Sequence, residues 1–240
     1  MNYSVTKRNF LKTTTGAAAG LSLLRSNRTW AQKSSGAKLK VALIGAGGIA
    51  KTAFNSCDKE LVVAVVDVDE KQGAPGFAQY PDAKRYKDFR KMLDAHDKEL
   101  DAVIVSTPDH THFPATYDAM QRGIAVQTQK PLTHNLWQAR TLQKAYHKFK
   151  VQTVMGNQGH TLEGIRYIKE WYEAGLAGEI KEVHAWTGRT TTNNTTAKLK
   201  ADLSPADIPA NLDWDLWQGG AAESPYYDGI VPGKWRWWWE

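Results

Sequence analysis

The glycine-rich stretch Gly-Ala-Gly-Gly-Ile-Ala at residues 45–50 has the composition and spacing of a phosphate-binding turn. It follows an apolar run over residues 39–44 and precedes an expected helix. Gly45 permits a tight turn, Gly47 lets the backbone approach a pyrophosphate, and Ala50 is small enough for close packing of helix and strand. The N–H groups at such a helix start attract an anion. We predict a phosphate site comprising Gly45, Gly47, Gly48, Ile49 and Ala50.

An acidic residue stands at the end of the next apolar run. Residues 61–66 are expected to form a buried strand, and Asp67 follows it, 22 residues after Gly45. A carboxylate there can accept both hydroxyls of an adenosine ribose and would repel a 2′-phosphate, which predicts NAD rather than NADP. Asp69 is the second candidate for this role. The alternative for Asp67 is an acid that only ends the strand or caps a helix.

Lys130 ends the apolar stretch Gly-Ile-Ala-Val-Gln-Thr-Gln-Lys-Pro at residues 123–131, where a strand should meet a loop. A lysine in this position is either a solvated strand end or a group that handles a proton during catalysis. Burial would lower its pKa toward working pH, and an ammonium group can stabilise a developing alkoxide. The surroundings of Lys130 therefore decide between the two interpretations.

Histidines and an asparagine follow two further expected strands. His110 and His112 lie close to Asp109 after the run 102–105, but no second cluster with metal-ligand spacing accompanies them, so we predict no metal site. Asn157 and His160 follow the last expected strand, where hydroxyl groups of a sugar could be bound. His160 could equally cap a helix that begins near residue 162, and the sequence leaves both roles open.

The elements that must position these residues alternate strictly between strand and helix from residue 38 to residue 157. Helices are expected over residues 114–122 and 135–149, for example, each between two apolar strand-like runs. This alternation predicts an α/β fold with a doubly wound parallel sheet. Because ligands bind at the carboxyl ends of such strands, the glycine turn, Asp67, the 106–112 loop, Lys130 and the 157–160 loop should share one rim.

The charge of the chain is concentrated at its N-terminus. The 240 residues carry a formal net charge of +6, but five Lys and Arg side chains lie in the first 31 residues, which contain no Asp or Glu. The remainder is nearly neutral, so nucleic-acid binding is not expected. Residues 1–31 resemble a twin-arginine export signal, with Lys7 in place of the first arginine, and their apolar part is too short to span a bilayer. This predicts a periplasmic or otherwise exported protein, and the single cysteine excludes an intramolecular disulfide.

Several motifs together resemble the Gfo/Idh/MocA oxidoreductases: VALIGAGGIA, VVDVD, VSTPDHTH, QKPLTH and GNQGH, in that order. The resemblance implies an NAD(P)-binding Rossmann domain over residues 38–157 and hydride transfer to or from a carbohydrate or related polyol. It makes Lys130 the catalytic lysine, with His160 a weaker catalytic or substrate candidate and Gln129 in place of the family's glutamate. The same resemblance implies further cofactor contacts by Ser106, Thr107, Pro108, His110, His112, Gln129 and Lys130.

The segment 158–240 is expected to be an incomplete C-terminal α/β domain of the open antiparallel sheet type. Residues 178–188, Gly-Glu-Ile-Lys-Glu-Val-His-Ala-Trp-Thr-Gly, predict its first strand, and a tryptophan-rich stretch ends the chain. The resemblance places this stretch with the exported, sugar-directed members, and we expect it to pack into the missing sheet. The chain is then a C-terminally truncated enzyme whose complete form is a homo-oligomer. The alternatives are a catalytically incomplete NAD-binding or protein-binding remnant, and an NAD-dependent glycoside-cleaving enzyme.

Overall fold

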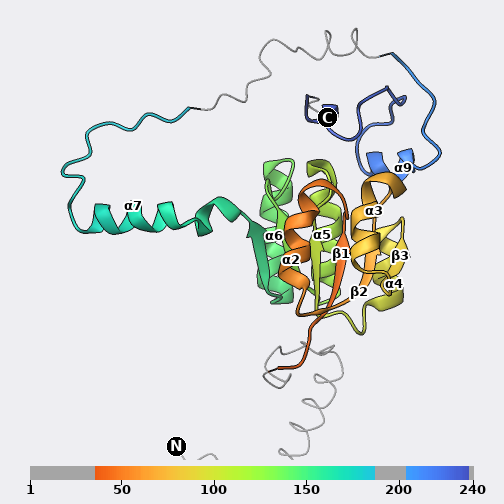
Figure 1. The fold of residues 1–240 in the computed structure, drawn as a ribbon, viewed down its shortest axis with the longest axis horizontal. Coiled ribbons are helices and arrows are strands. Elements are labelled where there is room, and N and C mark those ends of the chain that lie inside the picture. The colour runs from red at the N-terminus through yellow and green to blue at the C-terminus, as the bar shows by residue number, and fades with distance from the viewer. Residues whose placement is uncertain (1–35, 187–203, 238–240) are drawn as a thin grey trace, which may run out of the picture.

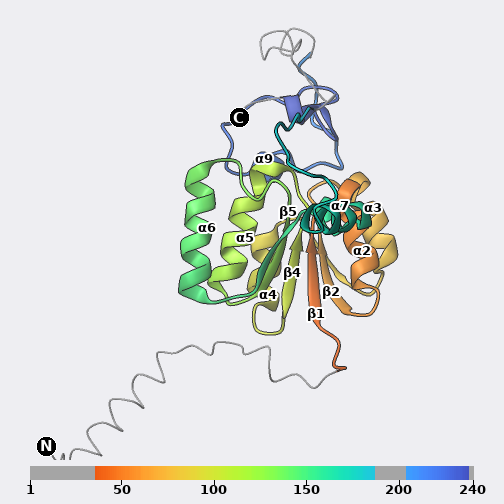
Figure 2. The same ribbon diagram turned by 90° about the vertical axis from the view of Figure 1, so that its left-hand side faces the viewer.

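The computed structural model describes residues 36–186 and 204–237 (Figure 1). The predicted export signal at residues 1–31 lies outside these ranges. Within them, a parallel sheet covered by helices on both faces forms the main body, helix α7 projects away from it, and a C-terminal segment lies beyond one end of the sheet (Figures 1 and 2). In this part of the chain no helix combines the length and the apolar character needed to cross a membrane.

The sheet confirms the predicted doubly wound arrangement. Its six strands are all parallel and lie in the order β3-β2-β1-β4-β5-β6. The strand order reverses between β1 and β4, which is where this architecture forms a crevice for ligands. The strands are β1 (Lys40–Ile44), β2 (Leu61–Val66), β3 (Lys84–Tyr86), β4 (Ala102–Val105), β5 (Ala125–Gln129) and β6 (Thr153–Gly156).

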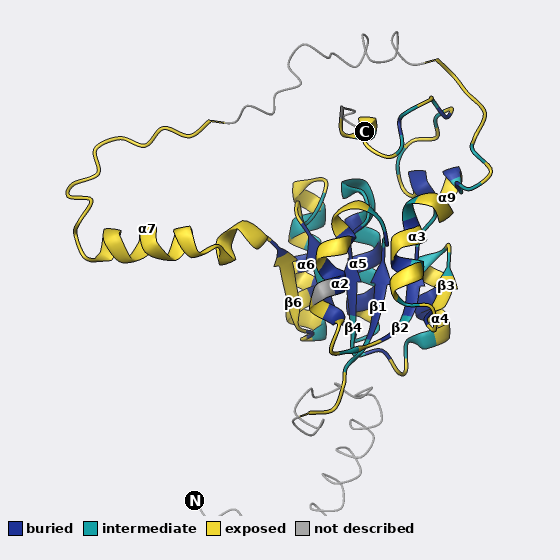
Figure 3. Cartoon of the chain, viewed as in Figure 1, coloured by how far each residue is buried: buried dark blue, intermediate teal, exposed yellow. Residues whose placement is uncertain are grey.

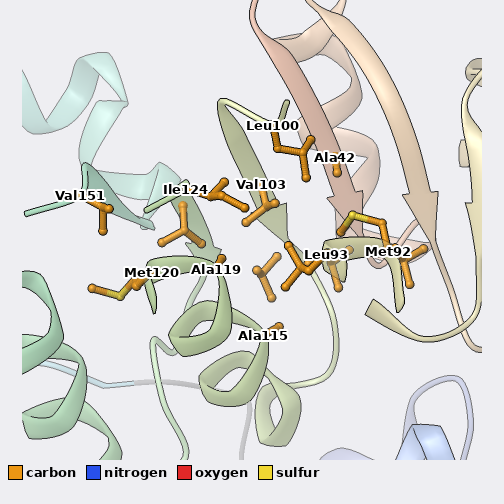
Figure 4. Close-up of a cluster of buried hydrophobic side chains, with 14 of the residues drawn as sticks. Ala42, Met92, Leu93, Leu100, Val103, Ala115, Ala119, Met120, Ile124 and Val151 are labelled. Atoms are coloured by element: carbon orange, nitrogen blue, oxygen red, sulfur yellow. The ribbon is translucent and has the colours of Figure 1, made fainter. Parts of the chain in front are cut away.

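Two buried clusters hold helices against opposite faces of the sheet, because successive strand residues point to opposite sides. On β1, Ala42 and Ile44 face helices α4 (Phe89–His96), α5 (His112–Gln121) and α6 (Leu136–Phe149). Figure 4 shows this cluster, and Figure 3 shows that the buried residues concentrate in the sheet and the inner helix faces.

The opposite face of the sheet is covered by two helices. Val41 and Leu43 of β1 join the cluster formed with α2 (Lys51–Cys57), against which Phe77 of α3 (Glu70–Gln79) also packs. Helix α5 begins at His112, two residues before the predicted start. The loop after β4 continues directly through a short 3₁₀ turn, Asp109–Thr111, into that helix.

The prediction of a strand over residues 178–188 is wrong for residues 178–186, the part of this range that the structure describes. Residues 179–186 are not paired in any strand and are exposed. A strand needs a neighbour to accept its backbone hydrogen bonds, and the described part of the chain offers none there. Helix α7 (Glu163–Glu173), which precedes this stretch, is fully exposed as well. The described residues therefore form no second-domain sheet.

The tryptophan-rich end also differs from expectation. Helix α9 (Trp214–Gln218) and the 3₁₀ turn Lys234–Trp237 fold back onto the first domain instead of extending away from it (Figure 1). Trp214, Trp217 and neighbouring apolar side chains bury one another in a third cluster, against which Val68 packs. The rim of the sheet after β2 thus provides a surface that these aromatic side chains cover.

Candidate functional site

A cavity of about 470 Å³ lies at the carboxyl ends of β1, β2 and β4. The glycine turn, Asp67 and the loop after β4 form one side of it, as the strand order predicts. The start of α4 and the C-terminal segment contribute the rest of its wall. The cavity is therefore built at the crevice of the sheet, between the rim and a segment distant in sequence.

The glycine turn brings bare backbone to the cavity. Gly45 has φ +88°, and a Cβ atom on it would lie 2.8 Å from the carbonyl group of Ser106. A Cβ atom on Gly47 would lie 2.5 Å from the carbonyl oxygen of Gln72, whereas Gly48 faces open space. Ala50 is buried under the turn. The turn thus requires glycine at its two tight positions and leaves room beside Gly48 for a ligand.

Asp67 lies against the glycine turn and lines the cavity. Its Oδ2 accepts a hydrogen bond from the Ala46 N–H at 2.9 Å, and its Oδ1 accepts one from the Asp69 N–H at 2.9 Å. Burial raises the pKa of this carboxyl group. Each oxygen retains capacity to accept a further hydrogen bond from a ligand hydroxyl group.

Asp69, the second candidate, has a structural role in this chain. Its Oδ1 accepts hydrogen bonds from the Lys71 and Gln72 N–H groups and so caps α3. The same atom accepts a hydrogen bond from Asn211 Nδ2 at 2.7 Å. Helix capping and contact with the C-terminal segment therefore explain the acid at this position.

Several polar side-chain atoms at the ends of β4 and β5 are buried without a hydrogen-bond partner. They are Ser106 Oγ, Thr107 Oγ1, and Oε1 and Nε2 of Gln129. Ser106 and Thr107 line the cavity, and because buried polar groups are normally paired, their unpaired hydroxyl groups indicate that a polar ligand supplies the missing partners. Together with the glycine turn, whose shape a Cβ atom would destroy, these atoms fit a bound dinucleotide.

His112, a predicted cofactor contact, is buried and makes contacts within the protein. It is only 1% exposed, and its ring nitrogens lie 2.6 Å from the Pro131 carbonyl oxygen and 2.8 Å from the Thr107 carbonyl oxygen. Both polar atoms of the ring are thus used within the protein. His112 instead ties the loop after β4 to the turn after β5, and so positions Thr107 relative to Lys130.

His110 is also occupied by the protein. Its Nε2 donates a hydrogen bond to the Trp217 carbonyl oxygen at 2.8 Å, and its ring lies between the rings of Trp217 and Trp235. Burial lowers the pKa of His110. His110 therefore attaches the C-terminal segment to the loop after β4, and its predicted cofactor contact stays a prediction. In the described ranges no group of three or more His, Cys, Asp or Glu side chains could hold a metal ion.

The predicted catalytic and substrate residues lie outside the cavity. Lys130 follows β5, Asn157 and His160 follow β6, and all three are exposed. The helix-capping role left open for His160 is wrong, because Leu162 is the N-cap residue of α7 and the helix start has no side-chain capping hydrogen bond. The structure thus brings the cofactor residues together and leaves the catalytic candidates on the neighbouring, open part of the same rim.

Sequence reasoning missed several residues that shape the cavity. Helix α3 passes so close that a Cβ atom on Gly73 would lie 2.7 Å from Asp67 Cβ, and one on Gly76 would lie 2.7 Å from Ala46 Cβ. Two glycines three apart in the expected helix that follows Asp67 were a signal of this close approach. Further wall residues that it missed include Lys87, Arg90, Asp215, Trp217, Trp235 and Arg236.

Comparison with known proteins gives a consistent family assignment. Residues 39–157 match the Gfo/Idh/MocA oxidoreductase family, described as having an NAD-binding Rossmann fold. A glycosyl hydrolase family 109 protein of Stenotrophomonas maltophilia is 28% identical over 204 residues, which cover 76% of this chain and 42% of that protein. An inositol 2-dehydrogenase of Renibacterium salmoninarum is 27% identical, covering 61% of this chain and 45% of its own length.

Solved structures show the same fold. The myo-inositol 2-dehydrogenase of Lactobacillus plantarum superimposes with a TM-score of 0.55 at 22% identity, covering 60% of this chain and 43% of that one. The scyllo-inositol dehydrogenase of Lactobacillus casei, solved with NAD(H) and scyllo-inositol, gives a TM-score of 0.54 at 19% identity with 60% and 43% coverage. This chain therefore spans less than half the length of these relatives.

Proposed function

Starting from the match of residues 39–157 to the Gfo/Idh/MocA family of NAD-binding oxidoreductases, we propose that this protein transfers a hydride between NAD and a polyol or sugar. The observation that supports this most is the cavity at the strand crevice. It combines a glycine turn that has no room for a Cβ atom at Gly45 or Gly47, a carboxylate with free acceptor capacity, and polar atoms without protein partners.

Each part of the cavity has a binding role in this proposal. The backbone of the turn at Gly47 and Gly48, together with the helix start behind it, binds the pyrophosphate. Asp67 accepts the hydroxyl groups of the adenosine ribose, and the unpaired hydroxyl groups of Ser106 and Thr107 bind the remaining polar groups. Bound NAD would accept the hydride, and the side chains of this chain would perform the other roles in the reaction.

We propose NAD rather than NADP as the preferred cofactor. The Asp67 carboxylate would repel a 2′-phosphate placed beside it. Of the three cations that line the cavity, two are already paired: Lys87 with Glu70 at 3.0 Å, and Arg90 with Asp88 at 2.8 Å. Neither is free to compensate for a second negative charge beside Asp67.

Lys130 is the proposed catalytic residue. It lies directly beyond β5, and the His112 ring connects the Pro131 carbonyl oxygen next to it with Thr107 of the cavity loop. Its ammonium group would stabilise the alkoxide that develops as the substrate hydroxyl gives its proton to solvent and the carbon gives its hydride to NAD. Asn157 and His160, at the end of the next strand, are the proposed contacts for substrate hydroxyl groups.

The test is turnover with NAD and a panel of inositols and simple sugars, followed by the absorbance of reduced nicotinamide. We expect Lys130→Met to reduce the rate by about 100-fold or more, in the range observed for positioned proton-transfer groups. Lys144→Met, on exposed α6, is the matched control and should retain the full rate. An unchanged rate in Lys130→Met would make Lys130 a solvated strand end. NAD binding without turnover of any substrate would instead support the cofactor-binding remnant.

A second reaction is favoured by one comparison. The match with the glycosyl hydrolase family 109 relative covers 76% of this chain and so extends past residue 157, where the match to the oxidoreductase family ends. An enzyme of this kind would need NAD yet accumulate no reduced cofactor, because oxidation of the sugar is reversed later in the cycle. Release of nitrophenol from nitrophenyl glycosides, dependent on added NAD, would distinguish this reaction from net dehydrogenation.

We also propose that the protein is exported in the folded state and that its complete form assembles as a homo-oligomer. The basic start and weakly apolar stretch of residues 1–31 support export. Fusion of these residues to a reporter that must fold before export gives the test. Export that persists after Arg8→Lys would argue against the twin-arginine route.

A further inference from the structure

The segment Asn211–Trp237, called here the tryptophan segment, bridges the two loops on either side of the cavity. At the loop after β2, the Asp213 N–H donates to the Val68 carbonyl oxygen at 2.9 Å, and the Glu70 N–H donates to the Asn211 carbonyl oxygen at 2.9 Å. At the loop after β4, His110 binds the Trp217 carbonyl oxygen. The segment is thus anchored on both sides of the cavity.

Between these anchors the tryptophan segment faces the cavity directly. Its residues in the cavity wall are Asp215, Leu216, Trp217, Gly219, Gly220, Val231, Pro232, Trp235 and Arg236. They come from two stretches that the aromatic contact between Trp217 and Trp235, with centroids 6.4 Å apart, holds together. This wall stands beside the glycine turn, Asp67 and Thr107, which form the rest of the same cavity.

Arg236 is the least committed of the three cations in the cavity wall. Arg90 donates to both carboxylate oxygens of Asp88, and Lys87 contacts Glu70 at 3.0 Å. Arg236 lies 3.5 Å from Asp109, at the edge of a hydrogen bond, and its side chain is 54% exposed. Its guanidinium carbon is 4.2 Å from the centroid of the Trp235 ring, which orients it by a cation–π contact.

We propose that the tryptophan segment is the second wall of the dinucleotide site and that Arg236 binds the pyrophosphate. This rests on the proposed binding of NAD. The negative charge of NAD resides on its pyrophosphate, so a cation facing the cavity has that group as its partner. Arginine matches phosphate through paired N–H donors. Asp109 holds the side chain loosely near its binding position until the phosphate takes over.

Calorimetric titration of the whole chain with NAD, ADP and adenosine tests this assignment. Arg236→Gln should weaken NAD and ADP binding by about 10- to 100-fold, the value of one charge-assisted hydrogen bond. Adenosine, which has no phosphate, should bind Arg236→Gln and the unaltered chain equally. Arg236→Lys should restore part of the loss. Arg166→Gln, on exposed α7, is the matched control and should bind all three ligands normally.

A purely structural role for Arg236 gives a different result with Asp109→Asn. If Arg236 only held the tryptophan segment to Asp109, this substitution would weaken NAD binding as Arg236→Gln does, and the assignment would be overturned. Under our proposal Asp109→Asn binds NAD at least as tightly as the unaltered chain, because a competing negative charge is removed. The thermal unfolding of both variants without ligand should match the unaltered chain, since the pair is 3.5 Å apart and Arg236 is largely exposed.

Different results would overturn the assignment of Arg236 and the proposed function. A chain that binds NAD with the same affinity after Arg236→Gln retains the proposed function but loses this phosphate contact. An unaltered chain that binds neither NAD nor ADP overturns the proposed function itself. NADP is titrated alongside these ligands. A loss of affinity in Arg236→Gln that is confined to NADP would place Arg236 at a 2′-phosphate and would also overturn the pyrophosphate assignment.

Discussion

At the scale of single residues, Asp67 and the glycine turn form one unit. The Asp67 carboxylate accepts the Ala46 N–H, so the acid that is proposed to hold the ribose also fixes the turn that is proposed to hold the pyrophosphate. Gly73 brings α3 against the same side chain. A change at any of these positions is therefore expected to affect both halves of the cofactor site.

Gly47→Ala provides a residue-scale prediction. The new Cβ atom would lie 2.5 Å from the Gln72 carbonyl oxygen, and backbone cannot move aside as a flexible side chain can. We expect the free energy of unfolding, measured in urea, to fall by about 1–3 kcal/mol, as for other overpacked sites. NAD affinity should fall with it. Gly159→Ala, which meets no atom within 4 Å, is the control; equal effects of both substitutions would contradict the account.

At the scale of elements, the tryptophan segment depends on neutral His110. Its ring donates to the Trp217 carbonyl oxygen inside an aromatic cluster, where a charged ring would be poorly solvated, so burial lowers its pKa. As the pH falls, the His110 ring of the unfolded chain binds a proton near the ordinary histidine pKa of about 6.5. The folded chain binds this proton only at a lower pH. Stability is therefore greatest above the ordinary histidine pKa and falls as the pH drops toward the lowered pKa.

The corresponding prediction concerns His110→Gln, which stays neutral at every pH and still offers an N–H donor. Urea unfolding between about pH 7 and pH 5 should show a smaller loss of unfolding free energy in His110→Gln than in the unaltered chain. His147→Gln, on the exposed face of α6, should retain the original pH dependence. If His110→Gln and the unaltered chain lose stability in parallel, His110 is not the titrating group.

The elements that the sequence predicted well are those whose determinants are local. Alternating strand and helix patterns gave the parallel sheet, and the rule for strand ends placed Gly45, Asp67 and Ser106 at one cavity. The contact of His110 with Trp217 joins residues 107 apart, and no local pattern reports it. The strand expected over residues 178–188 failed for the same reason, because pairing requires a neighbouring strand that local sequence cannot guarantee.

At the scale of the whole molecule, the proposed site has two parts. The cofactor cavity has walls on both sides, whereas the predicted catalytic and substrate residues are open to solvent. The tryptophan segment closes the cofactor cavity, whereas Lys130 and His160 remain exposed on the rim. Helix α7 projects beside them with Ile168 and Trp171 more than half exposed (Figure 3). Apolar surface of this kind is typical of a face that another element covers. This division explains why cofactor binding is the property to measure first.

The measurement that tests the central claim most directly is the affinity of the whole chain for NAD and for NADP, by calorimetric titration, with Asp67→Ala alongside. We predict that NAD binds at least about tenfold more tightly, since one repelled phosphate costs on the order of 1.4 kcal/mol. Asp67→Ala should weaken NAD binding and remove the preference between the two cofactors. Equal affinities in the unaltered chain, or a preference that survives Asp67→Ala, would contradict the account.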